Sequence, residues 1–304
     1  MQRFFLNSAV LSALALMAAR EAQAGELVAV QAQTTAPAEY DAPSPQTVSA
    51  NALELAASLP IEAGQRTYVL PGLGYRLEAP RFVDPPANGL PIPVFHDVEA
   101  HVSVVHAFDE RWSLFVRGAV GLAGDLHAVD AGVVRFGASA LAQRRFSERF
   151  AIGLGVAADY SFGELLPLPL VKLDWKTSRR TSLEGVLPLN LRFVWRPVDE
   201  ARTGLIADLD GNEYAVRNAS VRRNPPCSEP GGRSQCWDHL AATDLRVGAL
   251  IGIRLHRELW AELRGGASVY RRFELLNPDD GPVTGGDQRL PVAPFALAQV
   301  SYEF

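Results

Sequence analysis

Apolar and polar residues alternate along most of this chain, from about residue 66 to its last residue. The segment 94–107 is typical: one set of alternate positions is apolar and the other polar, with Val98, Ala100, Val102 and Val104 on one side and Glu99, His101 and Ser103 on the other. A period of two predicts strands with unlike faces. A helix would scatter these apolar positions around its axis, and the many glycines would destabilise it.

Twelve strands are predicted from this pattern. They cover residues 66–79, 94–107, 112–124, 132–146, 150–161, 168–176, 181–187, 189–196, 202–216, 240–255, 259–274 and 290–304. Pro188 is placed at a hairpin tip, because a proline inside a central strand would remove a ladder hydrogen bond.

The connections between these strands alternate in length. "FDER", "SER", "SRR", "VDEA" and "HRE" are tight and charged, whereas "LEAPRFVDPPANGLPIP" and "NPDDGPVTGGDQRLP" are long. Short turns at one end and long loops at the other are typical of transmembrane β-barrels. The fold class is therefore all-β: a transmembrane antiparallel up-and-down β-barrel over residues 66–304, with about 12 strands, and 10 or 14 as alternatives.

Aromatic residues lie close to the tight turns. Trp112, Trp175, Trp195 and Trp260 are all within a few positions of one. Such residues form an interfacial girdle in membrane barrels. Trp260 does not fit completely, because its position in the alternation faces it away from lipid.

The start of the chain is typical of an exported protein. Arg3, an apolar stretch from Phe4 to Ala19 and the small residues Ala22-Gln23-Ala24 match the three parts of a signal peptide, so residues 1–24 are predicted to be cleaved. A membrane anchor is the alternative, but the stretch is shorter than the roughly 20 residues of a spanning helix. Residues 25–65 are rich in Ala, Gln, Thr and Pro and are predicted to form a flexible periplasmic segment.

The last residues, "ALAQVSYEF", resemble the final strand of bacterial outer-membrane β-barrels, which ends on Phe with apolar residues at alternate positions. The resemblance implies that Val300, Tyr302 and Phe304 are the signal read by the barrel assembly machinery. It implies a location in the outer membrane of a Gram-negative bacterium, in contact with lipid and lipopolysaccharide. The closing strand is expected to pair with the first one, near Thr67 to Leu77.

A narrower resemblance covers residues 168–216, "LPLVKLDWKTSRRTSLEGVLPLNLRFVWRPVDEARTGLIADLDGNEYAV". A strand ending in Trp, a polar turn, a "VLP" step and a Gly-Asn-x-Tyr segment resemble a family of outer-membrane barrels known as domain of unknown function 6268. The resemblance implies no catalytic residues.

Cys227 and Cys236 flank eight polar and turn-forming residues. In an exported protein such a pair predicts a disulfide. A metal site is the alternative, with His239 as the nearby histidine. A redox-active pair is a third reading, although the spacing is not C-x-x-C.

The polar faces predict a lumen of mixed charge. The candidate lumen residues are Glu99, His101, Arg117, Arg135, Arg145, Lys172, Asp174, Arg192, Arg246, Arg254, Glu262 and Arg264. Such a lumen suits a structural barrel or a narrow channel for a small solute.

Few features of the sequence suggest catalysis. His101 and Ser103 share a face, but no known catalytic motif surrounds them, so the chain is expected to be non-enzymatic, with no cofactor and no metal. An outer-membrane enzyme acting on lipid or peptide, and a protein that binds through its Cys-bearing loop, are the alternatives. The formal net charge of −5 gives no electrostatic case for nucleic-acid binding.

Overall fold

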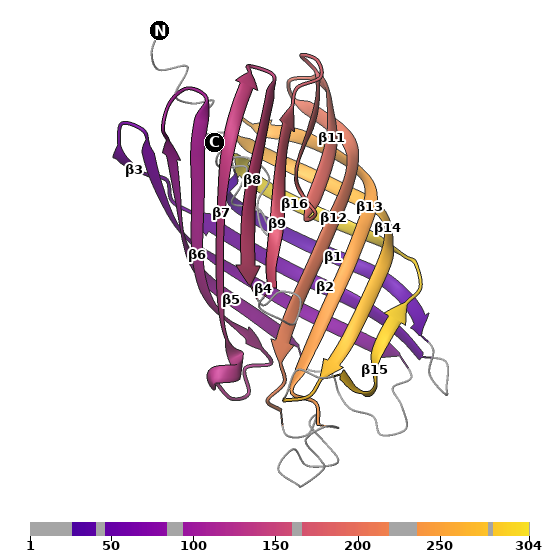
Figure 1. Cartoon of the computed structure of the whole chain (residues 1–304). Helices are drawn as coiled ribbons and strands as arrows, with labels where there is room; N and C mark the ends of the chain where they lie inside the picture. The colour runs from indigo at the N-terminus through magenta and orange to yellow at the C-terminus, as the bar shows by residue number, and fades with distance from the viewer. Residues whose placement is uncertain are drawn as a thin grey trace.

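The structure, a computed structural model, describes residues 26–40, 46–83, 94–159, 166–218, 236–278 and 282–303. These residues form a closed antiparallel β-barrel of fourteen strands (Figure 1). Among them, no helix is long and apolar enough to cross a membrane. The predicted signal peptide, Cys227 and Phe304 lie outside the described residues.

The wall follows the order of the chain. Its strands are β1 (Glu26–Tyr40), β2 (Gln46–Ser58), β4 (Thr67–Val83), β5 (Phe95–Ala107), β6 (Trp112–Gly124), β7 (Val134–Ser147), β8 (Phe150–Asp159), β9 (Leu166–Trp175), β10 (Thr181–Leu187), β11 (Asn190–Val198), β12 (Ala201–Ala215), β13 (His239–His256), β14 (Leu259–Leu276) and β16 (Ala293–Glu303). Two short strands, β3 (Ile61–Gly64) and β15 (Pro282–Leu290), extend the hairpins formed by β4 and β14. A 3-10 turn, η1 (Ala131–Val133), precedes β7.

The twelve predicted strands are all present, and two more precede them. β1 and β2 occupy most of the segment that was predicted to be flexible, so that prediction was wrong. The segment forms strands because both are paired along their length: β1 lies between β16 and β2, and β2 between β1 and β4. The backbone hydrogen bonds on both sides of each strand stabilise it, although its small and polar side chains include few of the β-branched and aromatic residues that favour strands.

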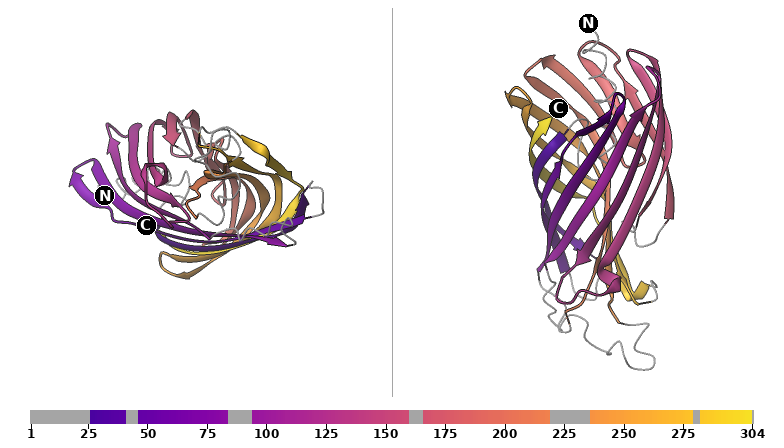
Figure 2. Two further views of the ribbon diagram at one scale, coloured as in Figure 1. Left: turned by 90° about the horizontal axis from the view of Figure 1, so that it is seen from below. Right: turned by 90° about the vertical axis from the view of Figure 1, so that its left-hand side faces the viewer.

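The closing pair of strands also differs from the expected one. β16 pairs with β1, with Val300 opposite Val30 and Ala298 opposite Ala32, and not with Thr67–Leu77 of β4. With two additional strands in the wall, the former first strand lies two places away from the closure. The strand number stays even, so Glu26 at the start of β1 and Glu303 at the end of β16 lie opposite each other at one end of the barrel (Figure 2).

Tight turns lie at one end of the barrel, at the top of Figure 1, where β1 begins and β16 ends. Four of these turns are 108–111, 148–149, 199–200 and 257–258. Trp112, Trp175 and Trp195 lie at this end and are exposed on the outer surface. Trp260 is buried and faces inward, as its place in the alternation indicated.

The outer surface carries an apolar belt. Val102, Leu154, Ile251 and Leu263, all predicted to face outward, are between 48 and 65% exposed. A belt of this kind faces lipid in membrane barrels. Val300 and Tyr302 of the predicted assembly signal also face outward.

The opposite end of the barrel is narrowed by β12. Beyond Asp208 this strand leaves its β11 partner, and its last residue, Ala215, pairs in parallel with Gly124 of β6. Tyr214 stacks on Phe95 of β5, with ring centroids 4.8 Å apart. The mouth at the long-loop end is thus closed in part by the chain's own strand.

Candidate functional site: an ion-paired lumen

All twelve predicted lumen residues lie at inward-facing positions of their strands. Most of them meet a partner of opposite charge or a hydrogen-bonding side chain. Arg192, Glu262 and Arg264 belong to an inner network nearer the tight turns, and Arg246 belongs to an outer network nearer the long loops.

The inner network surrounds Glu262, whose side chain is 1% exposed. Three guanidinium groups donate to its carboxylate: Arg192 Nη2 at 2.8 Å, Arg202 Nε at 2.9 Å and Arg264 Nε at 2.7 Å. They come from β11, β12 and β14. Arg202 also stacks over Trp260, with its Cζ 4.4 Å from the ring centroid, which explains why this tryptophan faces inward.

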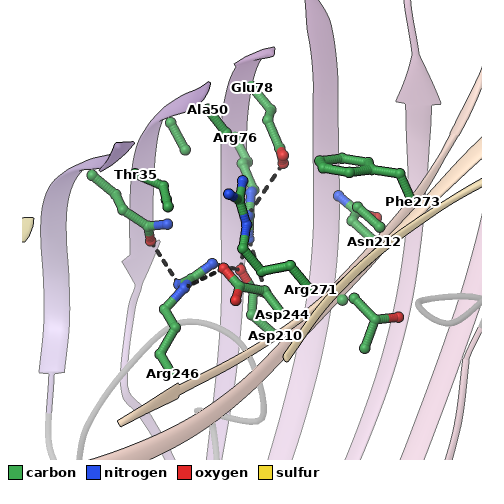
Figure 3. A pocket seen from close by; sticks show the side chains of 15 residues that line it. Thr35, Ala50, Arg76, Glu78, Asp210, Asn212, Asp244, Arg246, Arg271 and Phe273 are labelled. Carbon is green, nitrogen blue, oxygen red and sulfur yellow. Dashed lines mark hydrogen bonds and ion pairs between the residues drawn. The ribbon is translucent and has the colours of Figure 1, made fainter. Parts of the chain in front are cut away.

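The outer network joins opposite walls of the barrel (Figure 3). Arg76 of β4 donates two hydrogen bonds to Asp210 of β12, at 3.1 and 2.8 Å. Arg246 of β13 donates to the same carboxylate at 2.9 Å and to Asp244 at 2.8 Å. Because β4 and β12 are not neighbours in the wall, the Arg76–Asp210 pair crosses the interior.

Little free space remains beside the outer network. The space open to the centres of water molecules is about 30 Å³ there, and its walls include Arg76, Asp210, Arg246 and Arg271. Arg271 is 3% exposed, and its Nη1 has no hydrogen-bond partner within the described part of the chain. Water or a small polar group fits this space, whereas a sugar-sized solute requires the ion pairs to separate.

His101 contacts a different serine from the one singled out in the sequence. Ser58 Oγ of β2 lies 3.2 Å from His101 Nε2, and Glu99 Oε1 lies 3.2 Å from His101 Nδ1. Gly72 of β4 lies between the two strands, and a Cβ there would overlap both Ser58 and His101. Ser103 is fully buried. Glu99 also pairs with Arg117, so its carboxylate is shared.

One side of the interior is apolar, which the sequence analysis missed. A buried cluster extends across β4 to β10 and the turn after β10, and consists of Leu70, Val105, Phe115, Leu141, Leu170, Val186 and Leu189. The signal was present in the alternation, because Phe115 shares its face with Arg117 and Leu141 shares its face with Gln143. The prediction described each inward face by its charged residues, so the apolar residues on the same faces were overlooked.

The cysteine pair is only half visible, because Cys227 lies outside the described residues, so the disulfide stays a prediction. Among the described residues, no group of three or more His, Cys, Asp and Glu side chains could hold a metal ion.

A family model described as "Domain of unknown function (DUF6268)" matches residues 90–276, more than half of the chain. No curated protein matches the sequence. The family match covers β5 to β14 of the barrel, the whole inner network and the outer network without Arg76.

Several solved structures are similar in architecture. The TodX monoaromatic hydrocarbon channel (deltaS2 mutant) is 9% identical with a TM-score of 0.47, covering 91% of this chain and 89% of its own. The COG4313 outer membrane channel from Pseudomonas putida F1 is 8% identical with a TM-score of 0.45, covering 91% and 96%. LpxR from Salmonella typhimurium is 8% identical with a TM-score of 0.38, covering 91% and 100%. At these identities the comparison concerns the barrel fold alone.

Proposed function

We propose that this chain, which belongs to the family described as domain of unknown function 6268, is a non-enzymatic outer-membrane barrel that lets small solutes pass through a lumen narrowed by ion pairs. The observation that carries the proposal is the pairing of charges across the interior. Arg76 reaches Asp210 from the opposite wall, and three arginines converge on Glu262.

A purely structural role accounts less well for this interior. Buried ion pairs contribute little net stability, because desolvating the charges offsets their attraction, and well-packed apolar residues are often as stable or more so. A barrel needed only for its shape could fill its centre with apolar side chains, as it already does around Leu141. Charges lining a membrane barrel favour water and polar solutes instead.

Planar-bilayer recording of refolded protein tests the proposal. The wild type is expected to show small, steady conductance steps, because little free space remains beside the outer network. Asp210→Asn weakens both the Arg76 and the Arg246 contacts and is expected to enlarge those steps. Asp199→Asn, in an exposed tight turn, is the matched control and should resemble the wild type. Absence of conductance in all three proteins would support a structural barrel.

A second candidate function has one observation in its favour. Ser58, His101 and Glu99 are aligned as a nucleophile, a base and an orienting carboxylate would be. In a lipid or peptide hydrolase, Ser58 would be the nucleophile, His101 the base and Glu99 the carboxylate that orients the base. Hydrolysis of phospholipid or peptide substrates by the purified wild type, lost in Ser58→Ala, would favour this candidate. Equal, background-level activity of both proteins would exclude it for those substrates.

A further inference from the structure

The small cavity beside the outer network is lined by two arginines that have unused hydrogen-bond donors. Nε of Arg76 and Nη1 of Arg271 are both buried, and neither has a hydrogen-bond partner among the described residues. Both side chains line the same space of about 30 Å³, which Figure 3 shows from close by. Buried donors without an acceptor are costly, so an acceptor placed in this cavity is bound favourably.

A β-bulge directs Arg271 into the cavity. In β14, Val269 is an extra residue, because the ladder with β13 runs through Ser268 and Tyr270 but passes over it. Ser268 is buried inside the barrel, whereas Val269 is exposed on the outer surface. On a regular alternation counted from Ser268, Arg271 would face lipid. Bulges re-aim side chains in this way next to functional sites.

Neighbouring side chains hold both guanidinium groups while leaving a donor unused. The two Nη atoms of Arg76 donate to the two oxygens of Asp210, which leaves Nε for another acceptor. Cζ of Arg271 lies 5.9 Å from the ring centroid of Phe273, so an aromatic face supports this guanidinium group. The two donors are therefore presented by side chains whose positions are already fixed.

The acidic side chains in the cavity walls are already bound to arginines. Asp210 accepts from Arg76 and Arg246. Asp244 accepts from Arg246 at 2.8 Å, and Glu78 pairs with Arg76 at 3.2 Å. Within the described part of these walls, the buried side-chain atoms that have no hydrogen-bond partner are donors. The cavity therefore favours an anion over a cation.

The size of the cavity selects a small anion. One water molecule needs roughly 10–15 Å³ of such space, so a cavity of about 30 Å³ holds two or three atoms of that size. The N–H groups of a guanidinium match the oxygens of a carboxylate. Ala50, Ala52 and Phe273 add apolar surface to the walls. Formate, the smallest carboxylate, has the size and the chemistry that these walls accept.

We propose that this cavity is a binding site for a small monovalent carboxylate, which accepts hydrogen bonds from Arg76 Nε and Arg271 Nη1. The bound carboxylate supplies the acceptor that both arginines lack. It lies beside Asp210, which Arg76 already binds from the opposite wall. The inference deepens the proposed function by naming a solute class for the same lumen, and it rests on that function only in treating the bound anion as a solute that passes.

Binding of isotope-labelled formate, followed by nuclear magnetic resonance, tests the site. Wild-type protein refolded in detergent micelles should broaden the formate signal, because bound formate tumbles with the micelle. The buffer contains no chloride, which would compete for the same donors. Arg271→Gln removes the guanidinium group and its charge. Since hydrogen bonds to charged groups are the strong ones, the dissociation constant for formate should rise roughly tenfold or more.

Arg272→Gln is the matched control, because it removes the same charge from the next residue, which pairs with Glu274 and does not line the cavity. It should bind formate as the wild type does. Heat-modifiable gel mobility reports whether each variant is folded. If Arg271→Gln does not fold, Ala50→Val is measured instead, because it keeps every charge and fills part of the cavity. It should weaken formate binding by a similar factor.

Two results would overturn the site. One is a wild type that does not bind formate. The other is a folded Arg271→Gln variant, or Ala50→Val in its place, that binds formate as tightly as the wild type, because the formate would then be bound elsewhere.

Planar-bilayer conductance of the same proteins separates this inference from the proposed function. Formate binding that depends on Arg271, in a protein without conductance, supports the site and contradicts the solute passage. Conductance in a protein that does not bind formate overturns the site and leaves the ion-paired passage standing.

Discussion

The backbone N–H of Leu209 donates a 2.7 Å hydrogen bond to the carbonyl oxygen of Leu189. This bond lies at the point where the β10–β11 hairpin ends, just beyond the Asn190–Asp208 pair, while β12 continues to Ala215. β12 then bends toward β6 and closes part of the mouth. The narrowed mouth therefore begins where one short hairpin ends.

Backbone donors added to β9 beyond the end of the β10 ladder should destabilise the barrel. Pro167→Val/Pro169→Val adds two N–H groups beyond the last described β9–β10 pair, Val171 with Leu187, and each unsatisfied buried donor costs about 1–3 kcal/mol. We expect the urea midpoint of unfolding in lipid vesicles to fall. Pro291→Val, at an exposed connection, should leave it nearly unchanged. An equal midpoint for all three proteins would show that the β9 edge has acceptors that this account lacks.

The first strand should be essential for closure. Ala32→Pro removes an N–H from β1, which pairs with both β2 and β16 at this position. Loss of a ladder bond within the membrane is expected to abolish heat-modifiable mobility in gels. Gln65→Pro, in the exposed turn before β4, should be tolerated. If Ala32→Pro folded normally, residues 26–40 would not be part of the wall.

The strands with a uniformly apolar outer face could be predicted from the sequence, because there the alternation of apolar and polar residues is easy to recognise. Val98, Val102 and Leu154 are of this kind. β1 and β2 escaped prediction because Ala, Gln and Thr give little contrast between faces, and pairing on both sides supplies what composition does not.

The candidate site was predicted only in part. Inward-facing charges such as Arg246 and Glu262 could be assigned by their place in the alternation. Their partners could not, because Arg76–Asp210 and Arg192–Glu262 join strands that are far apart in the sequence. The narrowed mouth depends on the length of the β10–β11 hairpin relative to β12, which only the strand registers reveal.

Replacing Gly72 even with alanine should destabilise the barrel. A Cβ at this position would overlap the His101 ring and the Ser58 hydroxyl, so Gly72→Ala should separate them and destabilise the barrel by about 1–3 kcal/mol. Gly118→Ala is the control, because a Cβ there meets no atom within 4 Å. Urea unfolding of both variants checks this. Similar midpoints would mean that the Ser58–His101 contact is not tightly packed.

The terminal residue should matter for assembly beyond its own contacts. Val300 and Tyr302 face outward on the strand that closes the barrel, and Phe304 continues their alternation in the sequence. Deletion of Phe304 is expected to lower outer-membrane accumulation while export across the inner membrane continues. Phe304→Tyr should be mild and Phe304→Asp severe. Normal outer-membrane levels of the deletion variant would refute the assembly signal.

The central claim, that paired charges control a solute-conducting lumen, is tested most directly by the reversal potential of Glu262→Gln in a salt gradient across a planar bilayer. Without the Glu262 carboxylate, Arg192, Arg202 and Arg264 lose a shared partner, and their uncompensated charge should shift the reversal potential toward anion selectivity and change the conductance. Glu258→Gln, at an exposed turn, should match the wild type. A Glu262→Gln channel with the conductance and reversal potential of the wild type would contradict the account.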